Sequence, residues 1–133
     1  MDISELLSFA AYFSISLVLM VLFKIIYTMI TPHDEWKLIK ENKNTAAALG
    51  LGGAVIGFAI AISGTITNSI SILDFVIWSV VALVAQTLAF LIVRFVFMPK
   101  IVSRIENDEV SAGIMLAAVS ISVGLLNAAC MTY

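Results

Sequence analysis

Four uncharged, apolar runs divide the chain, and short charged segments separate them. The runs are Leu6–Phe23, Asn44–Leu73, Phe75–Val93 and Val110–Tyr133. A helix needs roughly 17–25 apolar residues to cross a bilayer, so the first run, the third run and Val110–Met131 each supply one span. The second run is too long for one span, and its end, SGTITNSIS, is rich in turn-forming residues. We therefore expect a helix from Thr45 to about Ile62, followed by a loop.

These runs predict an all-α membrane protein with four transmembrane helices in a single domain, residues 1–133. They do not alternate polar with apolar positions, which argues against the strands of a membrane barrel. The composition agrees, because 62% of the residues are hydrophobic and only 12% are charged, against about 25% charged in soluble domains. Asp2 and Glu5 stand where a signal peptide would be cationic, so we expect the first helix to be retained.

The distribution of charge predicts the orientation. All seven basic residues lie near the connection between the first and second helices or between the third and fourth. They are Lys24, Lys37, Lys40, Lys43, Arg94, Lys100 and Arg104. Basic loops stay cytoplasmic, so both termini and the loop near Thr67 are predicted to be periplasmic. Lys24 and Arg94 lie where long basic side chains extend to the membrane surface; a gating charge or substrate ligand is the alternative.

Each basic connection contains a proline that redirects the chain. The segment TPHDEWKLIKENKN predicts a short interfacial helix with Thr31 as its N-cap, Pro32 at its first position and Trp36 in the aromatic belt. PKIVSRIEN, which begins at Pro99, is its shorter counterpart.

The adjacent residues His33, Asp34 and Glu35 could suggest a metal site. Three consecutive residues at a helix start point in different directions, so we expect a solvated helix start there and no metal.

Two segments resemble each other. ENKNTAAALGLGGAVIGF and ENDEVSAGIMLAAVSISVGL align without gaps when Glu41 is set against Glu106. Together with the matched charges and prolines, this predicts a duplication of a helical hairpin, with repeat 1 at about 3–65 and repeat 2 at about 69–131. Both copies would run in the same direction, so the pseudo-two-fold axis lies along the membrane normal, unlike that of inverted-repeat transporters.

The second and fourth helices carry small residues four positions apart. Lipid offers little hydrophobic force to bring helices together, so close backbone approach supplies the packing. The predicted helix-packing residues are Gly50, Gly53, Gly57, Gly113, Ala117, Ser120, Gly124 and Ala128. We expect these helices to pack against each other or across a homo-oligomer, while the first and third face lipid more. Lining a narrow pore is the alternative.

No catalytic constellation is evident, so we expect a protein that is not an enzyme and has no cofactor or nucleic-acid partner. Gln86 and Asn127 are the candidates for a polar path through the membrane, although interhelical hydrogen bonds are the simpler use of such residues. Lys37, Lys40 and Lys43 are the candidates for a cytoplasmic docking surface.

Three segments carry a resemblance to a known family. ITPHDEWKLIKENKNTAAALG, SISILDFVIWSVVAL and AGIMLAAVSISVGLLNAACMTY closely resemble the YjfL family of small bacterial inner-membrane proteins, domain of unknown function 350. The similarity covers essentially the whole chain and is most specific at Asn44–Ala47 and Gly124–Thr132. It implies a four-helix inner-membrane protein with two related halves and no established activity. Members often occur with membrane-stress genes, including PspA-like and glutathionylspermidine-synthase-like proteins, which implies envelope maintenance and a cytoplasmic stress partner.

Two functional hypotheses follow. The first is a non-enzymatic protein that acts through helix packing and oligomerisation, as a membrane anchor for a cytoplasmic partner. The second is a small channel or transporter whose path is lined by the second and fourth helices.

Overall fold

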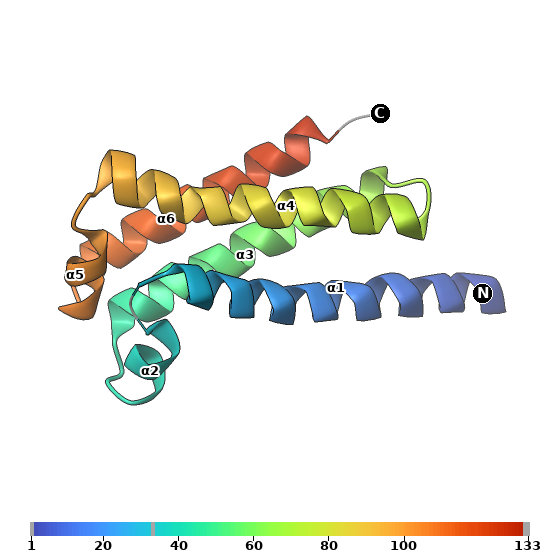
Figure 1. Ribbon diagram of the computed structural model, residues 1–133. Coiled ribbons are helices and arrows are strands. Elements are labelled where there is room, and N and C mark those ends of the chain that lie inside the picture. The colour runs from blue at the N-terminus through green and yellow to red at the C-terminus, as the bar shows by residue number, and fades with distance from the viewer. Residues whose placement is uncertain (1, 33, 132–133) are drawn as a thin grey trace.

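The computed structural model describes residues 2–32 and 34–131, and within them every regular element is a helix (Figure 1). The helices are α1 (Ile3–Ile30), α2 (Glu35–Lys40), α3 (Thr45–Asn68), α4 (Ile72–Ile92), the π-helical turn η1 (Val93–Phe97), α5 (Ile101–Glu106) and α6 (Val110–Cys130). In this part of the chain, four helices are long and apolar enough to cross a membrane: α1, α3, α4 continued by η1, and α6. The predicted all-α class and number of spans are confirmed.

The helix α3 is the centre of the bundle. Eleven of its 24 residues are buried, against seven of 21 in α4, five of 21 in α6 and three of 28 in α1. Its most extensive contact is with α6, while α4 contacts α3, α6 and α1. The prediction that the first and third long helices face lipid more is therefore right for α1 and wrong for α4. Because α4 lies against three long helices, it is more buried than α6.

Three aromatic pairs attach α1 to the rest of the bundle. They are Tyr12 with Phe75, Phe23 with Phe58, and Tyr27 with Phe90, whose ring centroids lie 5.2, 4.5 and 5.8 Å apart. Each such pair contributes about 0.5–1.5 kcal/mol beyond the area that it buries. The rest of α1 is mostly exposed, so this helix is held along one narrow aromatic seam.

The helix α3 continues six residues past Ile62, where the sequence predicted a loop; that prediction was wrong. The hydroxyls of Thr65 and Thr67 donate to the carbonyls of Ala61 and Ser63, four residues earlier, at 3.1 and 3.2 Å. Such bonds satisfy the hydroxyl groups inside a helix, so residues that favour turns in water are tolerated here.

The short helix α2 begins later than predicted. Thr31 is the C-cap of α1 rather than the N-cap of α2, and the carboxylate of Asp34 caps α2 by accepting from the Lys37 N–H at 3.2 Å. The expected solvated helix start is also wrong for Glu35, which is only 1% exposed. The chain folds α2 back against α3 and buries this first residue. His33 lies outside the described residues.

A long helix, a short helix and a second long helix follow one another in α1–α3 and again in α4–α6, where η1 additionally extends α4. Lys43 and Asp108, which the alignment of Glu41 with Glu106 pairs, share a left-handed backbone with φ of 51° and 55°. Non-glycine residues rarely adopt this conformation. The duplication that pairs these two positions stays a prediction.

A polar junction joins the two halves where α3 and α6 begin. The side-chain amide of Asn44 donates to the Ile105 carbonyl at 2.7 Å and its oxygen caps α3 by accepting from the Ala47 N–H at 2.8 Å. The Asp108 carboxylate accepts from the Ala46 N–H at 2.9 Å, so each half satisfies backbone groups of the other. A carboxylate there also complements the dipole of α3.

The two ends of the bundle differ in charge. In Figure 1, α2 and α5 lie at one end, while the start of α1, the α3–α4 connection and the end of α6 lie at the other. The residues Lys24, Lys37, Lys40, Lys43, Arg94, Lys100 and Arg104 belong to the first end, which we call the basic end.

This arrangement makes the predicted orientation testable by cysteine labelling. Cys130 is exposed and is first replaced by serine. Ile70 lies in the α3–α4 connection and is 86% exposed. We expect an impermeant maleimide to label Ile70→Cys on intact spheroplasts. Glu41→Cys, at the basic end, should react only after permeabilisation, because basic loops are retained on the cytoplasmic side. The reverse pattern would contradict the orientation.

Candidate functional site

The most closely packed part of the molecule is the crossing of α3 and α6. Glycines let two helix backbones approach until there is no space for a side chain between them. A Cβ added to Gly53 would overlap the backbone of Ala117, and one added to Gly113 would lie 2.5 Å from the Ala46 carbonyl oxygen. The two helices are therefore in direct backbone contact.

Gly57, Gly124 and Gln86 meet at the middle of the crossing. A Cβ on Gly124 would overlap the Gly57 backbone, and one on Gly57 would overlap both the Ser120 carbonyl and the Gln86 amide nitrogen. From α4, the Gln86 side-chain amide donates to the Ser120 carbonyl at 2.6 Å. This bond joins the third long helix to the glycine contact. We call these four residues the crossing site.

All the predicted small residues line this α3–α6 contact, within one chain. The neighbouring pairs are Gly50 with Leu116, Gly53 with Ala117, Gly57 with Ser120 and Gly124, and Gly113 with Ala46. Ala128 contacts Gly64, a residue that the sequence reading placed in a loop and therefore missed. The spacing of seven residues between Gly57 and Gly64 could have identified Gly64, since it places both glycines on the same helical face.

Several buried polar atoms lie in the crossing site or farther along α4 and α6. Ser79, Gln86 and Ser120 are all 0% exposed. Within the described residues, the Oγ atoms of both serines, the Gln86 Oε1 and the Asn127 Nδ2 make no hydrogen bond. Buried polar groups normally have partners, so these atoms, like the buried Tyr27 hydroxyl, leave hydrogen-bonding capacity unused. Gln86 belongs to the crossing site, whereas Asn127 lies two helical turns from Ser120 along α6.

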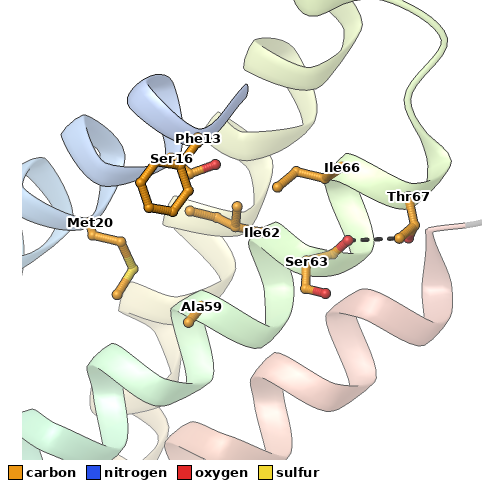
Figure 2. A pocket seen from close by; sticks show the side chains of 8 residues that line it. All are labelled: Phe13, Ser16, Met20, Ala59, Ile62, Ser63, Ile66 and Thr67. Carbon is orange, nitrogen blue, oxygen red and sulfur yellow. Dashed lines mark hydrogen bonds between the residues drawn. The ribbon is translucent and has the colours of Figure 1, made fainter. Parts of the chain in front are cut away.

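A cavity of about 290 Å³ separates α1 from α3 on the side away from the basic end. Figure 2 shows its lining: Phe13, Ser16 and Met20 from α1, and Ala59, Ile62, Ser63, Ile66 and Thr67 from α3. The Ser16 hydroxyl donates to the Tyr12 carbonyl at 2.7 Å and that of Thr67 to the Ser63 carbonyl. These two hydroxyl groups bond within their own helices, and Ser63 is the other polar residue of a mostly apolar lining.

The lysines of the predicted docking surface lie apart from the crossing site, at the basic end. Lys37 and Lys40 belong to the last turn of α2, where cations complement the helix dipole. Lys43 follows in the connection to α3, and all three residues are exposed. Across the described ranges, no group of three His, Cys, Asp or Glu side chains is placed to hold a metal ion.

Comparisons with known proteins extend over nearly the whole chain. The model of a family described as Domain of Unknown Function (DUF350) matches residues 1–131. The chain is 42% identical over 131 residues to the UPF0719 inner membrane protein YjfL of Escherichia coli strain K12, which covers 98% of both chains. It is 29% identical over 127 residues to the UPF0719 transmembrane protein YshE of Bacillus subtilis strain 168, covering 95% of this chain and 94% of the relative. No solved structure matches.

The close packing at the crossing site predicts that substitution by alanine changes stability differently at two glycines of α3. Gly57→Ala should lower the free energy of unfolding by about 1–3 kcal/mol, since the new methyl group meets backbone that cannot move aside. Gly52→Ala is the matched control, because nothing lies within 4 Å of a Cβ there. Reversible unfolding of the purified protein in mixed micelles measures both. Equal stability of the two variants would contradict the proposed contact.

Proposed function

The chain belongs to the DUF350 family, and we propose that it is a membrane scaffold without enzymatic activity that forms homo-oligomers and anchors a cytoplasmic partner in envelope maintenance. It is a multi-pass inner-membrane protein, as its relatives are named and as its four apolar spans require. The observation that carries the proposal is the closed crossing of α3 and α6.

The closed crossing favours a scaffold over a conduit. At Gly57 and Gly124 the two backbones touch, and Gln86 fills the remaining side with an amide that is 0% exposed. Gln86 and the glycines expected to line a path are thus used to fix one helix against another. A rigid pair of helices is the property that an anchor needs.

The outward faces of α1 support homo-oligomer formation. The small residues of α3 and α6 are used within the chain, so association between copies requires another surface. Phe9 and Phe13 stack on each other at 5.4 Å on the exposed side of α1 and are 63% and 52% exposed. Aromatic rings held in place lose little freedom when a second helix packs against them, and only three of the 28 residues of α1 are buried.

The basic end supports the docking part of the proposal. If basic loops are retained inside, then α2, α5 and the lysines Lys37, Lys40 and Lys43 face the cytoplasm. The polar junction at Asn44 and Asp108 holds these segments against the ends of α3 and α6. The membrane-stress genes that accompany members of the family support a partner of that class.

Charge reversal tests the docking surface. A photo-crosslinker placed at Asn42 in living cells should yield a discrete adduct with a soluble protein. Lys37→Glu, Lys40→Glu and Lys43→Glu together should reduce this adduct at least tenfold, because a complementary acidic surface would then be repelled. The same three positions changed to Arg keep the charge and should keep the adduct. An adduct that survives reversal would remove docking from the proposal.

A second candidate function, a small channel, is favoured by the unused polar atoms of Ser79, Gln86 and Ser120. Those atoms would offer a hydrogen-bonded route only if α4 moved relative to the α3–α6 pair.

Reconstitution separates the two functions. We expect potassium and proton flux into proteoliposomes to equal that of protein-free liposomes, while photobleaching of labelled protein counts more than one copy per complex. Flux that exceeds the control and falls in Gln86→Leu, with the copy number unchanged, would replace the scaffold by the channel. A count of one copy per complex would contradict the proposed homo-oligomer.

A further inference from the structure

Two ammonium groups gather around one indole ring at the basic end. The Lys24 Nζ, from α1, lies 4.2 Å from the centroid of the Trp36 ring, and the Lys40 Nζ, from the same short helix as Trp36, lies 5.8 Å from it. Cations within about 6 Å of a ring centroid are attracted by the face of the ring. Trp36 is itself 46% exposed, so the cluster is open at the surface of the protein.

The charges of these lysines are not neutralised by the acids around them. Among the described residues, neither Lys24 nor Lys40 makes an ion pair, whereas Arg104 in the second half pairs with Glu109 at 3.2 Å. The nearest acids in the sequence have other positions: Asp34 caps α2 and Glu35 is buried. Glu41 is exposed after α2. The two lysines beside Trp36 therefore keep their positive charge, and Lys40 is exposed.

The depth of Lys24 places this charge at a particular level of the bilayer. Eighteen uncharged residues, Leu6–Phe23, precede it, and at 1.5 Å per residue they span about 27 Å. This is close to the roughly 30 Å thickness of the hydrocarbon core. The ammonium group of Lys24 extends from the edge of the core to Trp36 on α2, at the level where lipid phosphates lie.

An apolar hollow lies on α1 and ends level with Lys24. It measures about 430 Å³ and is lined by Leu17, Val18, Val21, Leu22 and Ile25. Leu17, at one edge of this lining, precedes Lys24 by seven residues, or about 10.5 Å of helix, so Lys24 continues that edge. An acyl chain that lies along this edge would end near the Lys24 side chain.

We propose that Lys24, Trp36 and Lys40 form a binding site for the phosphate of an anionic phospholipid, whose acyl chain lies in the hollow on α1. Two cations beside one exposed indole match a phosphate that carries a net negative charge, and the indole occupies the interfacial layer that tryptophan prefers. A zwitterionic lipid brings its own cation and gains less from the cluster. The combination of charge, depth and an adjoining apolar surface selects a membrane lipid rather than a soluble phosphate.

The fluorescence of Trp36 reports on the site. Trp78→Phe leaves it as the sole tryptophan, and the full-length protein is reconstituted in phosphatidylcholine vesicles. At equal mole fraction, phosphatidylglycerol with brominated acyl chains should quench this emission more strongly than brominated phosphatidylcholine. Each lysine should contribute about fivefold to the relative affinity for phosphatidylglycerol. Lys24→Gln with Lys40→Gln should therefore abolish the preference. Lys43→Gln with Lys100→Gln removes the same charge elsewhere and should preserve the preference.

Equal quenching by the two lipids would overturn the proposal. So would a lipid preference that survives in Lys24→Gln with Lys40→Gln, or a preference that is reduced as much in Lys43→Gln with Lys100→Gln as in that pair. Inorganic phosphate added to the vesicles should leave the quenching unchanged. If phosphate reduced the quenching by competition, the site would bind soluble phosphate instead. Native mass spectrometry from mixed micelles gives an independent readout, since only variants with both lysines should retain phosphatidylglycerol. Docking of a protein partner can fail without affecting these results.

Discussion

Direct contact between two helix backbones, at Gly57 and Gly124, is the constraint on which the rest of the structure depends. Because lipid supplies no hydrophobic force between helices, a contact of this kind must come from close fit. Gln86 adds a hydrogen bond from α4 to the same point. One end of the α3–α6 pair is then fixed by the polar junction at Asn44 and Asp108.

Sequence patterns anticipated the features that depend on local spacing. Run lengths gave the four spans, and the four-residue spacing of small residues gave the faces that α3 and α6 bury. The end of α3 was misjudged because Thr65 favours turns in water, whereas within an apolar helix its hydroxyl bonds the preceding turn. The burial of Glu35 could not be foreseen, since it depends on how α2 folds back on α3. Nor could sequence show that Gln86 faces Gly57 rather than a path.

The four long helices differ in their surroundings. The α3–α6 pair and α4 form a closely packed interior, and α1 lies outside it, held by a seam of aromatic rings. Most of α1 faces its surroundings, where the proposed contacts with lipid at Lys24 and with a second copy at Phe9 and Phe13 lie. A rigid interior with one helix devoted to external contacts suits a scaffold.

The crossing also has a consequence for biosynthesis. The helix α6 follows α3 only after α4, η1 and α5 in the chain, so the glycine face of α3 has no partner until α6 has been made. During that interval α4 and α5 must be inserted beside it, and neither supplies the backbone contact that α6 makes. A product that stops before α6 would thus expose the glycines of α3 to quality-control proteases, and the arrival of α6 conceals them.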